Sequence, residues 1–303
     1  MPDASADCLI VGGGPAGLVA ATYLGRFRRK VILVDSAQSR AAWIPVTHNL
    51  IGFSEGISGP DLLGRMRRQA DQYSAERLHG VIENVEVLPD GSFVSSSTVG
   101  RIVVRKVLIA TGGLDIQPKI NDAAAAVGAG LIRHCPICDA FEATGRKIAL
   151  IAYGECRVKE AMMLRGYTSD LTVLTFGNPM QLSVADRQSL EAAGIRIIPS
   201  PVEKLCRRDN DIAAWISDRP DPLIFDTVYS ALGTRLRSEL ALALGAKADD
   251  DGALLVDRHQ QTTVPGLYAA GDVVQGLSQV SVAAGQAAIA ATAINAGLPY
   301  IRY

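Results

Sequence analysis

The chain has 303 residues, of which 48% are hydrophobic and 20% charged, a composition typical of a soluble globular protein with one large or two ordinary domains. Its net charge of −1 argues against a dedicated nucleic-acid surface, and no apolar run is long enough to span a membrane. The acidic first residues lead straight into a strand, so no signal peptide is expected, and five cysteines with one closely spaced pair fit a reducing cytosol.

The first expected elements are a strand, a glycine-rich turn, a helix and a second strand, over residues 7–36. Gly12, Gly14 and Gly17 form the pattern G-x-G-x-x-G, and the second strand ends at Asp35. Such glycines let a backbone approach a pyrophosphate at a helix N-terminus, and an acid in this place accepts hydrogen bonds from a ribose hydroxyl. The pattern predicts a dinucleotide site. Asp35 disfavours a 2′-phosphate and so favours FAD or NAD over NADP, and a ligand-free glycine turn is the alternative.

Further along the chain, a strand is expected at 100–113, and a second strand–turn–helix unit begins near residue 146. Its expected elements are a strand at 146–154, a helix at 155–167, a strand at 171–176, a helix at 184–194 and a strand at 195–200. Residues 225–233 are expected to return towards the first domain, which a strand within 262–274 and a helix at 281–298 complete. The pattern predicts an α/β fold with two Rossmann-like dinucleotide-binding domains, the second inserted in the first. The expected domains are residues 1–115 with 240–303, and residues 116–239.

Cys135 and Cys138 stand three residues apart at an expected helix start, directly before Asp139. A structural zinc site needs four ligands, usually in two separated pairs, and the sequence holds no second C-x-x-C and no H-x-x-x-H. Two cysteines at this spacing can form a disulfide, and a helix N-terminus favours the thiolate. The pattern therefore predicts a redox dithiol. Asp139 can protonate a leaving thiolate, although a simple helix-start charge would explain it equally well.

Six segments, taken in order, carry a resemblance to a known family. They are VGGGPAGLVAA, GFSEGISGPDLL, LIATGG, HCPICDAFE, VPGLYAAGDV and GQAAIAA. They extend from residue 9 to about residue 293, and the set resembles the low-molecular-weight thioredoxin reductases, which are flavoprotein disulfide reductases with two dinucleotide-binding domains.

The resemblance implies that the first domain binds FAD. The residues implied for cofactor binding are Gly12, Gly14, Pro15, Ala16, Gly17, Asp35, Asn49, Thr111, Gly112, Gly271, Asp272 and Gln279. Asp272 would hydrogen-bond the ribityl chain or a phosphate, and Gln279 would lie near the isoalloxazine. Two positions depart from the family: Ser278 replaces an arginine, and Trp43 replaces a smaller polar residue near the flavin.

The resemblance also implies a role for each member of the dithiol. Cys138 would face the flavin, Cys135 would attack an external disulfide, and Asp139 would act as acid and base. The implied partner is thioredoxin or another CxxC protein, and the implied assembly is a homodimer. Ala140 stands where the family has glycine.

The expected nicotinamide turn, AYGECRVKEA at residues 152–161, differs from the pattern of the family. The departures are Ala152, Tyr153, Glu155 and Arg157, which add bulk and charge where a pyrophosphate needs a close backbone approach. Residues 174–180 hold no arginine pair for a 2′-phosphate. We therefore expect NADPH use to be weak or lost, with reduced ferredoxin, another flavoprotein or a small reductant as donor. A drifted but working site, with Arg157 or Lys159 on the phosphate, is the alternative.

The sequence thus predicts a cytoplasmic, FAD-dependent dithiol–disulfide oxidoreductase resembling thioredoxin reductase, with no nucleic-acid or membrane partner. Two alternatives stay open: a flavin-dependent dithiol oxidase that uses oxygen, and a non-catalytic flavin redox sensor. A further hypothesis is that the tail with Tyr300 and Tyr303 covers one face of the flavin.

Overall fold

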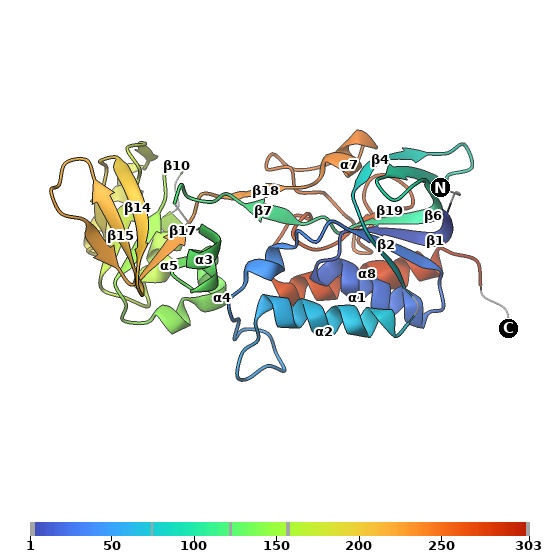
Figure 1. Ribbon diagram of the computed structural model, residues 1–303. Coiled ribbons are helices and arrows are strands. Elements are labelled where there is room, and N and C mark those ends of the chain that lie inside the picture. Colours follow the sequence, from blue (N-terminus) through green and yellow to red (C-terminus); the bar gives the residue numbers. More distant parts are fainter. Residues whose placement is uncertain (1–3, 74, 121–122, 156–157, 301–303) are drawn as a thin grey trace. The chain divides into compact units, whose positions relative to one another are not determined.

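The computed structural model describes residues 4–73, 75–120, 123–155 and 158–300, and its contacts divide them into two compact units (Figure 1). Unit 1 comprises the described residues of Met1–Ala42, Gly59–Leu114 and Arg235–Tyr303, and unit 2 comprises those of Trp43–Ser58 and Asp115–Thr234. The predicted α/β class, with a second Rossmann-like unit inserted in the first, is confirmed. The domain boundaries given above stay a prediction, because compact contact units need not be independently folding domains.

Unit 1 is built on a seven-stranded sheet of order β3-β2-β1-β6-β5-β4, with β19 paired to β6. Its strands are β1 (Ala4–Val11), β2 (Val31–Asp35), β3 (Glu76–His79), β4 (Ile82–Val87), β5 (Phe93–Ser97), β6 (Ile102–Ile109) and β19 (Leu267–Ala269). The strands β1, β2, β3, β6 and β19 pair with one another in parallel. The pairs β4–β5 and β5–β6 are antiparallel. The runs CLIV of β1 and VILV of β2 are buried throughout, as expected for parallel strands covered on both faces.

The helices of unit 1 are α1 (Pro15–Arg26), η1 (Arg40–Trp43), α2 (Gly59–Asp71), α7 (Glu239–Ala243) and α8 (Val280–Ala296). Within the unit, α1 packs against both α2 and α8 (Figure 1). Arg29, just beyond α1, fastens the end of α8, because its guanidinium donates to Asn295 Oδ1 at 2.7 Å and to the Pro299 carbonyl at 2.7 Å. Tyr300 beyond this anchor is 97% exposed. Tyr303 lies outside the described residues, so the hypothesis that the tail covers the flavin stays a prediction.

Unit 2 is built on a five-stranded parallel sheet of order β13-β11-β9-β17-β8. Its strands are β8 (Ile132–Arg133), β9 (Ile148–Ile151), β11 (Leu171–Leu174), β13 (Arg196–Ile198) and β17 (Thr227–Ser230). The helices are α3 (Ala123–Gly128), α4 (Pro136–Asp139), η2 (Phe141–Ala143), α5 (Val158–Arg165) and α6 (Val184–Ala192). The remaining strands of unit 2 are β10 (Gly154–Glu155), β12 (Met180–Gln181), β14 (Val202–Arg208), β15 (Asp211–Ile216) and β16 (Leu223–Phe225). The strands β7 (Gly113–Asp115) and β18 (Thr234–Leu236) each contain residues of both units.

Two expectations for unit 2 need correction. Residues 225–233 do not leave towards the first domain, because β17 lies within the second sheet between β9 and β8, and all four of its residues are buried. Of the expected helix at 155–167, the structure describes α5 over Val158–Arg165, and Glu155 does not belong to a helix, because Gly154–Glu155 pairs with Met180–Gln181 as a short parallel ladder. The antiparallel sheet β14-β15-β16 was not anticipated. Among the helices that the structure describes, none is long and apolar enough to cross a membrane.

Candidate active site

The glycine turn of unit 1 brings β1 and α1 into direct contact. A Cβ atom on Gly17 would overlap the carbonyl oxygen of Gly12, and one on Gly12, which has φ +108°, would overlap the carbonyl oxygen of Ala110. Pro15 is the first residue of α1, and no side chain among the described residues caps this helix start. The first-turn N–H groups of α1 therefore stand at a narrow, small-residue turn, which is the arrangement that accepts a phosphate.

The acid at the end of β2 lies beside this turn. A Cβ atom on Gly13 would collide with the Asp35 carboxylate, and Asp35 Oδ1 accepts a hydrogen bond from the Ala37 amide at 3.0 Å. The structure thus brings Asp35 to the glycine turn, as the spacing of the two in sequence predicted. Its carboxylate is in place for a ribose hydroxyl of a bound dinucleotide.

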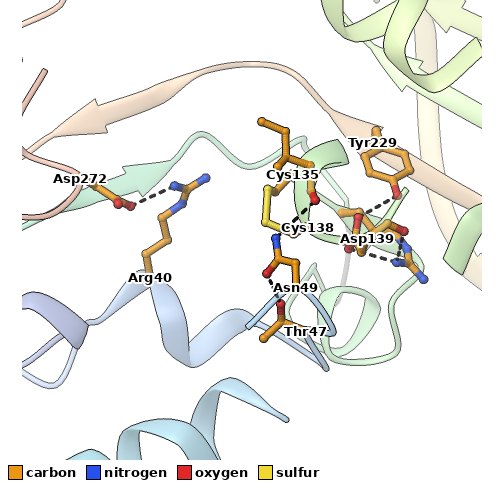
Figure 2. The surroundings of a disulfide bond; sticks show 10 residues. Arg40, Thr47, Asn49, Cys135, Cys138, Asp139, Tyr229 and Asp272 are labelled. Carbon is orange, nitrogen blue, oxygen red and sulfur yellow. Dashed lines mark hydrogen bonds and ion pairs between the residues drawn. A yellow bond between two sulfur atoms is a disulfide. The ribbon is translucent and has the colours of Figure 1, made fainter. Parts of the chain in front are cut away.

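The Gly271–Asp272 pair lies beside the first turn of α1. Ala16 is buried against it, because a Cβ on Gly271 would come within 3.1 Å of the Ala16 Cβ atom. Asp272 Oδ2 forms an ion pair with Arg40 Nη1 at 3.0 Å (Figure 2). Sequence reasoning missed Arg40, because its partner is 232 residues away and nothing local marks it.

Three further residues implied for the flavin also lie in unit 1. Thr111 Oγ1 donates to the Arg237 carbonyl at 2.5 Å, and Gly112 has φ +64° with open space where a Cβ would stand. Gln279 is the extended residue at the start of α8. The glycine cradle, the uncapped helix start, Asp35 and the cation of Arg40 fit the phosphates and ribose of FAD, and FAD is the group that the resemblance implies for this unit.

Asn49, unlike the other residues implied for the flavin, belongs to unit 2. Its segment, Trp43–Ser58, packs within unit 2, where Asn49 Nδ2 donates to the Ile137 carbonyl at 3.3 Å. Asn49 Oδ1 accepts from Thr47 Oγ1 at 2.8 Å (Figure 2). The structure therefore places Asn49 on the backbone between the two cysteines, and its proposed position near the flavin stays a prediction.

The two cysteines form a disulfide at the start of α4, with their Cα atoms 5.3 Å apart. Cys135 is the residue before the helix, Pro136 is its first residue, and the Cys138 amide donates to the Cys135 carbonyl at 2.9 Å. The expected helix start and sulfur–sulfur pairing are thus present. Across the described residues, His, Cys, Asp and Glu side chains form no group of three that could hold a metal ion.

Asp139, the last residue of α4, is enclosed by two side chains that sequence reasoning missed. Tyr229 donates its hydroxyl to Asp139 Oδ1 at 2.8 Å, and Arg133 Nη1 lies 3.0 Å from Asp139 Oδ2 (Figure 2 labels Tyr229 and Asp139). Burial raises the pKa of Asp139, while the Arg133 charge and the two hydrogen bonds act in the opposite direction. A partly buried carboxyl that directly follows a disulfide can hold or release a proton for it.

Two histidines border the disulfide region. His134 Nε2 lies 3.1 Å from Gln117 Oε1, and His48 Nδ1 lies 3.2 Å from Glu142 Oε1.

The glycine turn of unit 2 has another arrangement. Ala152 is fully buried after β9, and Tyr153 is partly exposed. The next two residues, Gly154–Glu155 of β10, pair in parallel with Met180–Gln181 of β12, the segment that follows β11. In a Rossmann fold the ribose and pyrophosphate lie between these two segments, so their direct backbone pairing leaves less room for a dinucleotide. Arg157, offered above as a phosphate ligand, lies outside the described residues.

Comparison with known proteins gives the same picture over nearly the whole chain. The family described as pyridine nucleotide-disulphide oxidoreductase matches residues 6–287. Thioredoxin reductase of Peptoclostridium litorale is 28% identical over 308 residues, 94% of each chain, and that of Listeria monocytogenes is 26% identical over 296 residues, covering 94% of this chain and 91% of the relative.

Among solved structures, HlmI is 29% identical with a TM-score of 0.87, covering 96% of this chain and 91% of HlmI. Thioredoxin reductase from Streptococcus pyogenes has a TM-score of 0.88 at 23% identity, covering 97% and 98% of the two chains, and this likeness supports the fold. With the glycine turn, the disulfide and the partly buried acid that follows it, these matches show that the chain belongs to the pyridine nucleotide-disulphide oxidoreductase family and is an oxidoreductase of the low-molecular-weight thioredoxin reductase type.

Proposed function

We propose that the protein is an FAD-dependent dithiol–disulfide oxidoreductase that passes electrons through Cys138 and then Cys135 to a protein disulfide such as that of thioredoxin. The observation that carries this proposal is the Cys135–Cys138 disulfide at the start of α4, directly followed by the partly buried Asp139. A disulfide that accepts two electrons and two protons becomes two thiols, and FAD supplies the electrons when it is bound and reduced. The relatives named thioredoxin reductase support the class of protein substrate.

The proposed FAD site lies in unit 1. The glycine turn and the start of α1 would hold the pyrophosphate, and Asp35 would accept hydrogen bonds from the adenosine ribose. Asp272 would meet the ribityl chain or a phosphate, with Arg40 fixing its carboxylate. The remaining residues of unit 1 proposed for FAD are Pro15, Ala16, Thr111, Gly112, Gly271 and Gln279. Asn49, which belongs to unit 2, is also proposed to lie near the flavin.

The proposed electron donor is not a nicotinamide nucleotide. The backbone pairing of Gly154–Glu155 with Met180–Gln181 supports this, because it joins the two segments between which the nucleotide would have to enter. Residues 174–180 also supply no arginine or lysine for a 2′-phosphate. Reduced ferredoxin, another flavoprotein or a small reductant is the donor that we propose, for a homodimer acting in the cytoplasm.

The proposal is tested by a single turnover without any nucleotide. Protein holding FAD is photoreduced anaerobically by one two-electron equivalent and mixed with oxidised thioredoxin, and the new thioredoxin thiols are counted. We expect close to two thiols per wild-type chain and none from Cys135→Ser or Cys138→Ser, while FAD content is unchanged. Cys206→Ser, a partly exposed free cysteine on β14, is the matched control and should behave as wild type.

Two results would contradict this function. Full thioredoxin reduction by both Cys135→Ser and Cys138→Ser would make the disulfide structural. Failure to reduce thioredoxin, together with rapid peroxide formation from oxygen and a small dithiol, would instead assign the protein as a dithiol oxidase. If the protein showed neither thioredoxin reduction nor peroxide formation, the flavin redox sensor would be the remaining assignment.

A further inference from the structure

We propose that Arg133 and Tyr229 are positioning residues that fix the Asp139 carboxyl beside the disulfide and set the pH at which it exchanges a proton with the dithiol. This inference rests on the proposed function, because it concerns the protons that accompany electron transfer through Cys135 and Cys138. Each residue contacts Asp139 through a carboxylate oxygen, and we assign each its effect through that carboxylate.

The sheet of unit 2 brings these side chains to one place. Arg133 on β8 and Tyr229 on β17 are direct register partners on neighbouring parallel strands. Partners at the same register in a parallel pair project to the same face of a sheet. Both side chains reach the end of α4, where Arg133 Nη1 also donates to the backbone carbonyl of Asp139 at 3.2 Å. Asp139 is thus held through both of its carboxylate oxygens and its main chain.

The two holding groups are themselves fixed by contacts that do not involve Asp139. Arg133 Nε donates to the Gly130 carbonyl at 3.0 Å, and the same carbonyl accepts from Thr227 Oγ1 at 3.2 Å. Tyr229 is 1% exposed and packs in the core cluster that contains Ile148 and Leu150 of β9. A guanidinium and a hydroxyl anchored in this way meet the carboxylate without first having to be ordered.

The charges around Asp139 oppose one another. Burial favours the neutral acid, and the carboxylate of Glu142, three residues on in η2, does so too. Arg133 and the Tyr229 hydroxyl favour the carboxylate. Glu142 is itself paired with His48 of the Trp43–Ser58 segment, whose Nδ1 lies 3.2 Å from Glu142 Oε1. Removal of Arg133 or of the Tyr229 hydroxyl should therefore raise the pKa of Asp139.

The proton balance gives this arrangement a function. When the dithiol passes two electrons to an external disulfide, the external S–S bond and the two S–H bonds of the cysteines are broken, and the internal S–S bond forms. The two protons leave the cysteines for the released external sulfur atoms, directly or through a nearby base. An ionised Asp139 can accept one of them, and a protonated Asp139 cannot. A variant that keeps Asp139 protonated to a higher pH should therefore reoxidise well only at a higher pH.

The test measures reoxidation of the photoreduced dithiol by 5,5′-dithiobis(2-nitrobenzoate), in single turnovers between pH 5 and 9. For Arg133→Gln, the ionisation that depends on Asp139 should move upward by about one to three pH units. For Tyr229→Phe the upward shift should be up to about one unit. Arg133→Lys keeps the cation and should restore most of the wild-type profile. Tyr167→Phe, a tyrosine packed against the same core cluster, is the matched control and should cause no shift.

The shifts should vanish when each substitution is combined with Asp139→Asn, because the group that titrates is then absent. An equal loss of rate at every pH, or a shift that persists with Asp139→Asn, would overturn the proposal. Tyr229→Phe and Arg133→Lys keep the test valid if Arg133→Gln does not fold. The oxidant in this test is a small aromatic disulfide and not thioredoxin. The pH profile therefore tests the roles of Arg133 and Tyr229 even if the protein does not reduce thioredoxin.

Discussion

Each of the two units contains a strand that is followed by a turn and a helix. The turn after β1 in unit 1 and the turn after β9 in unit 2 have different backbone arrangements. After β1, Gly12 and Gly17 bring strand and helix so close that no Cβ atom fits, with Asp35 beside them. After β9, the turn begins with the buried Ala152 and continues as β10, which pairs with β12. The first turn is open to a phosphate, and the second is bonded to its neighbouring segment.

The difference separates two roles in a dinucleotide-binding domain. The apolar strands stabilise the sheet, and the glycine turn binds the ligand. The strand runs IALI of β9 and LTVL of β11 are buried throughout and pair in register, so the parallel sheet of unit 2 is kept. Its core depends on apolar strands and not on glycine in the turn. If unit 2 has lost its nucleotide site, as we propose, it persists as a scaffold for the disulfide and Asp139.

The largest effect is expected from Gly17→Val, which puts side-chain atoms onto the carbonyl oxygen of Gly12. We expect loss of bound FAD and a fall of about 3 kcal/mol in the free energy of unfolding, measured by flavin absorbance and chemical denaturation. Gly64→Ala is the control, since the new methyl group on α2 meets only Arg68 Nη1, at 3.7 Å. It should stabilise the protein by about 0.5–1 kcal/mol. Full FAD occupancy in Gly17→Val would remove the first turn from the cofactor site.

The second prediction contrasts the two turns directly. In an anaerobic titration followed by flavin absorbance, NADPH and NADH should reduce the flavin poorly even at about 1 mM, whereas dithionite or light should reduce it fully. The reason is the backbone pairing of β10 with β12 in unit 2. Stoichiometric bleaching within seconds by micromolar NADPH would show that the second turn still binds its nucleotide, and the protein would then be an ordinary NADPH-dependent reductase.

A smaller effect is expected from Asp35→Asn, which keeps the shape of the side chain and removes its charge. The lost charged hydrogen bond to a ribose should weaken FAD binding by about 1.5–3 kcal/mol, or roughly 10- to 100-fold. Fluorescence titration of the apoprotein with FAD measures it. Asp170→Asn, which removes an exposed ion pair with Arg196 in unit 2, should leave FAD affinity unchanged. Equal affinities for wild type and Asp35→Asn would take Asp35 out of the site.

The smallest effect on activity is expected from Cys8→Ser in β1. Cys8 is fully buried, and burial raises the pKa of its thiol, so iodoacetamide should not label it in the folded protein. Turnover should be unchanged. Because only the unfolded chain can release this proton above about pH 8.5, wild type should lose stability there relative to Cys8→Ser. Denaturation at pH 7 and pH 10 compares them, and rapid native labelling of Cys8 would contradict its burial.

The sequence was sufficient for the features whose partners are close along the chain. The glycine turn with Asp35, and the cysteine pair with Asp139, are local patterns, and the structure brings each set together as expected. The ion pair of Arg40 with Asp272 and the bond of Tyr229 to Asp139 join residues 232 and 90 positions apart, so only the sheet topology could reveal them.

The errors have the same origin. A run such as TVYS is buried and strand-like in either unit, and its place in the second sheet is decided by the partners β8 and β9 and not by its own residues. The residues of β10 resemble a glycine turn that opens a helix, and only their pairing with β12 shows that they form a strand. The sheet to which TVYS belongs and the strand conformation of β10 thus depend on non-local strand pairing, which local sequence patterns do not specify.

The anchor that Arg29 provides at Pro299 has a practical consequence for handling the protein. It fixes the chain at the end of α8 that is remote from Gln279, and a helix of 17 residues is about 25 Å long. A linker joined beyond this point would leave from the side of unit 1 away from the glycine turn. Attachment to an electrode through such a linker should keep the flavin region facing solution, so that the reduction potential of the bound flavin could be measured on an immobilised layer.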